Sequence, residues 1–222
     1  MTIETALNPS RWPAIVEGVL RARPTSLRWL LMIIVVFGVA YGLVMGSFSV
    51  DGHLRGKQML YSSLKMPLLL LATFAISLPS FFVLNTLLGV RDDFAVAIRS
   101  IAATQAGLTI VLASLGPLTA VWYASSAVYE RAILFNALMF AIASLAAQWL
   151  LRRLYKPLIE RDPRHRMLLR CWLVIYAFVG IQMGWLLRPF IGNPDVATEF
   201  FRAESWGNAY VVVWEMIVKS IH

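Results

Sequence analysis

Five long runs of apolar residues, each about the length needed to cross a lipid bilayer, dominate the sequence. They extend over about 29–48, 66–89, 101–123, 132–151 and 171–190. A bilayer core of roughly 30 Å takes about 20 apolar residues in helical form, and in lipid only helices and closed barrels satisfy their backbone hydrogen bonds. The sequence therefore predicts an all-α, polytopic membrane helix bundle with about five transmembrane helices.

The composition supports a single membrane domain. Hydrophobic residues make up 59% of the chain and charged residues only 14%, whereas soluble domains have roughly 45–50% and 25%. We expect a cytoplasmic N-terminal segment over 1–28, a transmembrane domain over 29–190 and a non-cytoplasmic C-terminal segment over 191–222. No cleavable signal peptide is evident, so the first run is expected to act as an uncleaved anchor.

Both ends of the chain contain candidate interfacial helices. After Ser10, a potential helix cap, apolar residues recur on one face of a short amphipathic helix, as in helices that lie in the membrane surface. The stretch 206–221 would reach only about 24 Å as a helix, less than the bilayer core. We expect an interfacial or re-entrant helix there, with a sixth span as the alternative.

The distribution of basic residues predicts the orientation. If the N-terminus is cytoplasmic, that side holds 13 of the 20 Lys and Arg, as the positive-inside rule requires. The prediction is an integral protein of the bacterial inner (cytoplasmic) membrane. Because the basic residues sit at the ends of apolar runs, the net charge of +8 indicates lipid contact and no nucleic acid partner.

Glycines spaced by four residues mark two candidate helix-packing faces. Gly38, Gly42 and Gly46 share one face of the first span, and Gly180 and Gly184 share one in the fifth. Small residues at this spacing let two helix backbones approach closely. The seams predict either packing within the chain or contact with a protein partner or second copy.

Uncharged polar residues lie near the basic ends of their spans: Asn85, Thr104, Gln105 and Gln148. They are expected either to line a shallow polar cavity or to hydrogen-bond between helices. Pro79 and the Gly116-Pro117 pair are expected to kink or interrupt their helices.

The segment 152–170 holds seven basic residues, and Pro157 and Pro163 are expected to limit helix formation there. Within it, Arg161, Arg164 and Arg166 are candidate contacts for anionic lipid or a partner. Arg188, which ends the fifth span, is a similar candidate on the opposite side.

The interiors of the five predicted spans contain no Asp, Glu, Lys, Arg or His, which argues against a pump or proton-coupled carrier. The three histidines, His53, His165 and His222, fall outside the spans, so neither membrane haem nor a metal site is predicted. No nucleophile and base are paired within a span. We therefore expect no enzyme activity, cofactor or metal.

One short motif resembles a known family. The charged turn at 87–94, LLGVRDDF, followed by Ala97 and Arg99, is similar to the linker between the second and third spans of Yip1-like membrane proteins. The resemblance covers about residues 64–151, whereas Arg188-Pro189-Phe190 and the C-terminal extension depart from the family pattern. It implies a five-span, non-enzymatic protein that organises membrane or recruits partners.

Two functions remain open from the sequence. The first is a non-catalytic scaffold or accessory subunit of a membrane complex, which the glycine seams and short loops favour. The alternative is a passive transporter, channel or lipid-handling protein, which the prolines and the uncharged polar residues favour.

Overall fold

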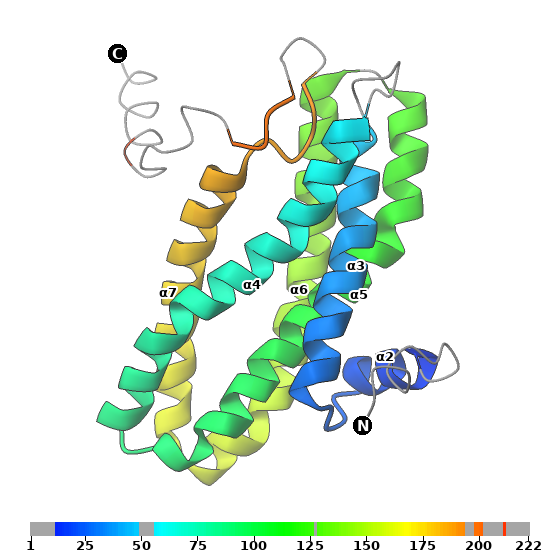
Figure 1. Cartoon of the computed structure of the whole chain (residues 1–222). Coiled ribbons are helices and arrows are strands. Elements are labelled where there is room, and N and C mark those ends of the chain that lie inside the picture. Colours follow the sequence, from blue (N-terminus) through cyan, green and yellow to red (C-terminus); the bar gives the residue numbers. More distant parts are fainter. Residues whose placement is uncertain (1–11, 49–55, 127, 194–197, 202–210, 212–222) are drawn as a thin grey trace.

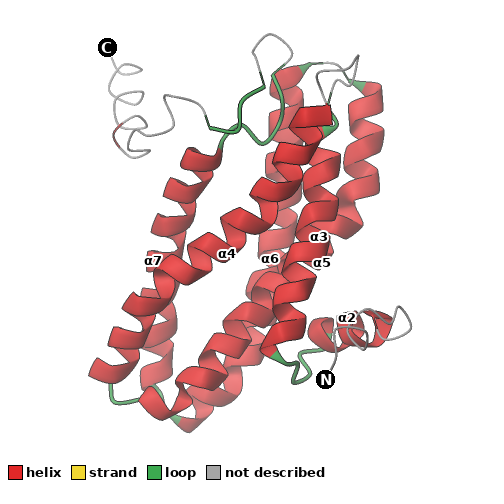
Figure 2. Ribbon diagram, in the orientation of Figure 1, coloured by secondary structure: helices red, strands yellow, loops and turns green. Residues whose placement is uncertain are grey.

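The structure, a computed structural model, is described for residues 12–48, 56–126, 128–193, 198–201 and 211, and within these residues it contains helices and no strand (Figure 2). The helices are α2 (Trp12–Leu20), α3 (Leu27–Gly46), α4 (Gly56–Leu87), α5 (Phe94–Ser125), α6 (Tyr129–Arg161) and α7 (Arg164–Leu187), with a 3-10 turn, η2 (Arg91–Asp93), between α4 and α5. The predicted cap at Ser10 and the stretch 206–221 lie outside the described residues.

The five predicted spans are confirmed as helices, because α3 to α7 are all long and apolar enough to cross a membrane. Leu134 and Leu145 on α6 are 69% and 72% exposed, as expected of side chains covered by lipid. The helices extend beyond the apolar runs. α4, for example, begins ten residues before the predicted start of its span. Outside the hydrocarbon core a helix can carry polar side chains, so helical turns can continue from the core into the interface.

The predicted interruption at Gly116-Pro117 is wrong, because α5 is continuous through Pro117. α4 is also continuous through Pro67 and Pro79, and the kink expected at Pro79 stays a prediction. In a membrane bundle, neighbouring helices and hydroxyl side chains compensate for the backbone bonds that a proline removes.

The segment 152–170 is also different from its prediction. It forms the last turns of α6 and the first turns of α7, joined by a tight turn at Asp162 and Pro163. Pro157 is held within α6 because its neighbours Tyr155 and Leu158 are buried in the core. Pro163 precedes the first turn of α7, where no backbone donor is needed.

The five long helices pack side by side in the order α7, α4, α3, α5 and α6 (Figure 1). α3 packs against both α4 and α5, α6 packs against α5, and α7 packs against α4. α6 and α7 meet at their connecting turn and have few contacts beyond it. α2 lies across one end of the bundle, where Trp12 packs edge-on against Trp29 at a ring separation of 5.8 Å.

Close backbone contact joins α3 to α4. A Cβ atom added at Gly42 would lie 2.7 Å from Ser63 Cα, and one at Gly46 would lie 2.7 Å from Met59 Cα. Neither distance is possible for a real side chain without a shift of backbone. The glycine seam of α3 is therefore covered by α4 of the same chain.

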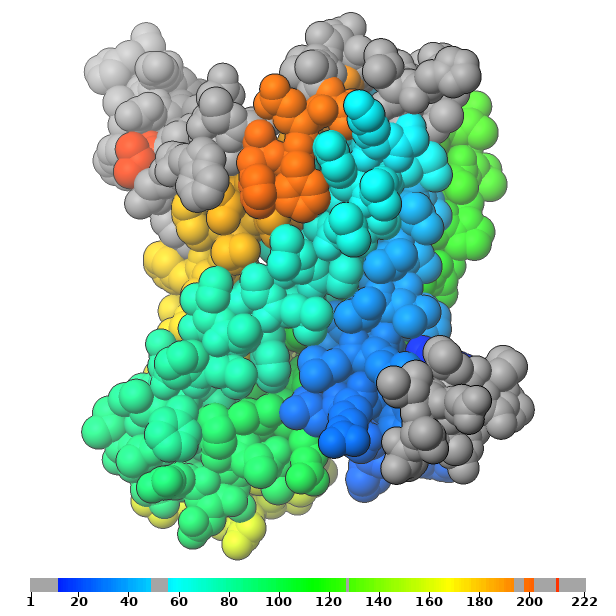
Figure 3. All heavy atoms as spheres, viewed as in Figure 1, coloured from blue at the N-terminus to red at the C-terminus, as the bar shows by residue number. Residues whose placement is uncertain are grey.

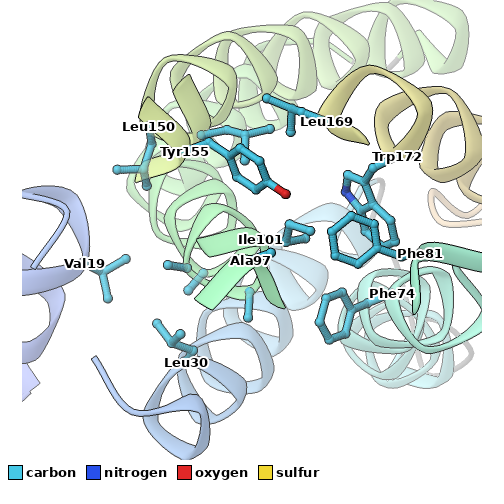
Figure 4. Packing of buried hydrophobic residues seen from close by; sticks show 14 of the residues in the cluster. Val19, Leu30, Phe74, Phe81, Ala97, Ile101, Leu150, Tyr155, Leu169 and Trp172 are labelled. Carbon is cyan, nitrogen blue, oxygen red and sulfur yellow. The ribbon is translucent and has the colours of Figure 1, made fainter. Parts of the chain in front are cut away.

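A cluster of buried aromatic residues fills the bundle near the end that carries α2 (Figure 4). Trp172 of α7 packs against Phe74 and Phe81 of α4, with ring separations of 6.3 and 4.8 Å. Tyr155 of α6 approaches the same cluster from the opposite side. This packing fixes the relative positions of α4, α5, α6 and α7 at that end.

At the other end, the segment after α7 is bound to the start of α4 (Figure 3, orange against cyan). Lys65, predicted to lie outside the second span, is a fully buried residue of α4, and its Nζ donates to the Pro189 carbonyl at 2.8 Å. Ser62 and Gln58 donate to the Phe190 carbonyl. These donors hold the chain that follows Leu187 against the bundle.

Candidate functional site

One end of the bundle, called here the basic end, collects exposed cations. It is the end at which α3, α5 and α7 begin and α4 and α6 finish. The exposed basic residues there are Arg21, Arg23, Arg28, Arg91, Arg99, Arg152, Arg153, Lys156, Arg161, Arg164, Arg166 and Arg170. A surface of this charge attracts anionic lipid headgroups.

A pocket of about 380 Å³ lies at the basic end, between the α2–α3 turn and α5; it is called here the headgroup pocket. Its polar lining consists of Arg23, Thr25, Ser26, Arg99 and Ser100. Its apolar lining includes Leu30, Ala103 and Leu154. The pocket therefore combines cations and hydroxyl groups with an apolar floor, the arrangement that suits an amphiphile with an anionic head.

The turn after α2 places Arg23 at this pocket. The amide of Ala22 donates to the Val19 carbonyl and the amide of Arg23 donates to the Gly18 carbonyl, which is the Schellman pattern of a helix end. Ala22 has the left-handed φ of 57° that this turn requires. Such a conformation is usually left to glycine, and an alanine there stores roughly 1 kcal/mol or more of backbone strain.

Arg23 and Arg99 are the two cations of the headgroup pocket. Neither makes an ion pair within the described part of the chain. Arg23 comes from the turn and Arg99 from the second turn of α5, so they reach the pocket from different elements. Two arginines that line one pocket can provide the guanidinium groups that bind a phosphate.

A buried carboxylate at the basic end links the turn before α5 to the end of α6 and the start of α7. Asp93, in the turn before α5, accepts hydrogen bonds from Arg161 Nη1 at 2.7 Å and from His165 Nε2 at 3.1 Å. His165, expected outside any helix, is a fully buried residue in the first turn of α7. Asp93, Arg161 and His165 are called here the carboxylate clamp.

Two of the predicted lipid contacts therefore serve the fold. Arg161 belongs to the carboxylate clamp, and Arg164 donates to Asp162 and to the Leu88 carbonyl. The hydrogen bonds from Arg164 hold the pKa of Asp162 below its usual value. Arg166 remains exposed and makes no ion pair in the described residues, so it stays a candidate for lipid contact.

Three of the four predicted cavity residues come together. Thr104, Gln105 and Gln148 line a pocket of about 140 Å³ between α5, α6 and α7. Asn85 lies elsewhere: it is buried in α4 and its Nδ2 donates to the Phe81 carbonyl. Ser144 and Tyr176 complete the polar lining, and the sequence interpretation missed both. We call this space the amide groove.

The remaining predicted residues lie far from the basic end. A Cβ added at Gly38 would be 3.4 Å from Pro67, and one at Gly180 would be 3.6 Å from Thr73, both ordinary contacts with α4. Gly184 has no neighbour within 4 Å among the described residues, so no packing contact is seen there. Arg188 lies over the Trp185 ring, 3.3 Å from its centroid, at the end opposite the basic end.

Sequence reasoning did not find Arg23 and Arg99 as a pair, because they are 76 residues apart and each looks like an ordinary basic residue beside a span. The only local signal for a shared site is that small hydroxyl residues follow each arginine within three positions: Thr25 and Ser26 after Arg23, and Ser100 after Arg99.

The chain matches no family model, no curated protein and no solved structure.

Proposed function

We propose that the chain is a non-catalytic, lipid-binding membrane protein whose headgroup pocket binds the phosphate of an anionic phospholipid. The observation that carries the proposal is that Arg23 and Arg99, which have no ion-pair partners in the described residues, both line one pocket of about 380 Å³. Its volume is within the range of pockets that enclose small ligands, roughly 300–1,000 Å³. The hydroxyl groups at its rim add hydrogen bonds, and Leu30, Ala103 and Leu154 suit the first carbons of the acyl chains.

Orientation supports the same function. The proposal places the basic end in the cytoplasm of a bacterium and the chain in the inner membrane, where the cytoplasmic leaflet attracts clustered arginines. α2 then lies along that surface, which fits a helix that enters the interface.

Cysteine labelling tests this orientation. In a Cys171→Ser background, Asp92→Cys places a thiol at the basic end and Val128→Cys places one at the other end; both residues are exposed. We expect a membrane-impermeant maleimide to label Val128→Cys in intact cells and Asp92→Cys only after lysis. The reverse pattern would place the basic end outside the cytoplasm.

Thermal unfolding with added lipid tests the pocket. A ligand that binds only the folded state raises its stability, by about 2.7 kcal/mol at a concentration 100 times Kd. In an uncharged detergent, we expect short-chain phosphatidylglycerol to raise the Tm of the wild type more than phosphatidylcholine of equal chain length. Arg23→Gln with Arg99→Gln removes two contacts of about 1 kcal/mol each and should weaken binding roughly 30-fold.

The matched control is Arg166→Gln with Arg170→Gln. It removes the same charge from exposed residues of the basic end that lie outside the pocket. We expect it to keep most of the Tm response to phosphatidylglycerol. If both double variants lose the response equally, general surface charge and not the pocket attracts the lipid.

The scaffold function predicted from the sequence stays a hypothesis. The α3 glycine seam is occupied by α4, so a homo-oligomer or partner would need another surface. Among the five glycines of the predicted seams, Gly184 on α7 is the position with open space beside it in the described residues.

A further inference from the structure

We propose that the amide groove is a second, separate lipid site, which binds the free hydroxyl of a neutral lipid alcohol of the diacylglycerol type. The groove lies between α5, α6 and α7, on a different face of α5 from the headgroup pocket, and the two sites share no residue. The inference does not depend on the function proposed above.

An unpartnered amide atom is the first observation. Gln105 is 5% exposed, and its Nε2 donates to the Tyr176 hydroxyl at 2.7 Å. Its Oε1 is buried and has no hydrogen-bond partner in the described part of the chain. Leaving a buried acceptor without a donor costs about 1–3 kcal/mol. Gln105 lines the groove, so a ligand donor that reached its Oε1 would remove that cost.

The opening of the groove also carries polar groups that lack partners. Gln148 and Ser144, one turn apart on α6, line the groove and are exposed, and neither makes a hydrogen bond within the described residues. In a membrane this surface faces lipid, where uncharged polar groups need partners from a neighbour. A ligand there must accept from the Gln148 amide as well as donate to Gln105.

The depth and size of the groove select the ligand. Gln148 lies one turn from Arg152, or about 6 Å along the helix, so the groove sits just below the headgroups of the basic end. Its volume of about 140 Å³ fits a hydroxyl with the few carbons beside it, but not a helix of about 10 Å diameter. A hydroxyl both donates and accepts, whereas ester and ketone oxygens only accept.

The apolar lining suits the rest of such a lipid. Trp172, Leu173 and Leu108 line the groove beside the amides, and they offer acyl carbons a surface that continues into the hydrocarbon core. α6 and α7 have few contacts beyond their connecting turn, so the chains of a bound lipid can leave sideways between them.

Photo-crosslinking in nanodiscs tests the site. Two probes are compared, a diazirine-bearing diacylglycerol and the same lipid acetylated on its free hydroxyl. We expect the free alcohol to label the wild type at least about fivefold more, on peptides of α5, α6 and α7, with competition by unlabelled diacylglycerol. Gln105→Leu should reduce that excess to the level of the acetylated probe.

A filling variant keeps the test independent of the Gln105–Tyr176 bond. Ser144→Phe places a ring at the mouth of the groove on an exposed position, and Ser114→Phe is its control on an exposed position of α5 outside the groove. The excess labelling by the free alcohol should disappear in Ser144→Phe and persist in Ser114→Phe. Equal labelling by the two probes, or equal loss in both variants, would mean annular lipid only and would overturn the site. Arg23→Gln with Arg99→Gln should leave this labelling unchanged.

Discussion

Gly42→Ala is expected to lower the Tm of the purified protein by about 6–12 °C, although alanine is the better helix former. The new Cβ would lie 2.7 Å from Ser63 Cα and closer still to the Ser62 carbonyl oxygen, both backbone atoms of α4. Overpacking costs about 1–3 kcal/mol, and a backbone contact belongs at the upper limit. Each kcal/mol shifts the Tm of a chain of this length by about 2–4 °C. Gly42→Leu should prevent accumulation of the folded protein.

Two other glycines provide matched controls for this prediction. At Gly38 the nearest atoms to an added Cβ lie at 3.4 Å, and at Gly184 nothing lies within 4 Å. Gly38→Ala should have little effect, and Gly184→Ala should leave the Tm unchanged or raise it slightly, because alanine favours helix by up to about 1 kcal/mol. A Gly42→Ala protein as stable as Gly184→Ala would show that α4 does not lie against Gly42.

Asp93→Ala is expected to destabilise the bundle by about 3 kcal/mol, or roughly 6–12 °C in Tm. The substitution removes the acceptor of His165, whose side chain is fully buried and whose Nδ1 has no partner in the described residues. The imidazole would then be buried without any hydrogen bond. Thermal unfolding in detergent measures the loss, which should be similar in the presence and absence of lipid.

The exposed partner of the carboxylate clamp gives the control. The Arg161 side chain is 73% exposed, and exposed ion pairs contribute at most about 1 kcal/mol. Arg161→Gln should therefore change the Tm much less than Asp93→Ala. Combining Asp93→Ala with His165→Leu should restore part of the loss, since no buried polar group is then left unpaired. Equal losses in Tm for Arg161→Gln and Asp93→Ala would contradict the claim that the buried pair of Asp93 and His165 contributes most of the stability of the clamp.

The spans were predictable because lipid imposes one rule on all of them, a run of about 20 apolar residues. The close contact at Gly42 and Gly46 was also predictable. Residues four apart lie on the same face of a helix, and small residues on one face allow a second backbone to approach. The helical form of 152–170 was not predictable. Pro157 is tolerated within α6 because Tyr155 and Leu158 are buried, and their burial depends on helices that are far away in the sequence.

The sites were only partly predictable. Thr104, Gln105 and Gln148 were recognised as uncharged polar residues at similar depth, and they do line one groove. Asn85 shares that property but lies elsewhere, because depth does not determine which helix faces meet. Tyr176 and Asp93 were missed because their roles depend on partners 71 and 72 residues away, Gln105 and His165. Pairing of Arg23 with Arg99 required the turn at Ala22, which no glycine in the sequence indicates.

Native mass spectrometry of the protein released from membranes of mixed phospholipid composition tests the central claim most directly. We predict that the wild type retains one anionic phospholipid more tightly than any zwitterionic lipid. Arg23→Gln with Arg99→Gln should lose that lipid, while Arg166→Gln with Arg170→Gln should keep it. Equal retention of anionic lipid by all three proteins, or no preference for it in the wild type, would contradict a headgroup site in this pocket.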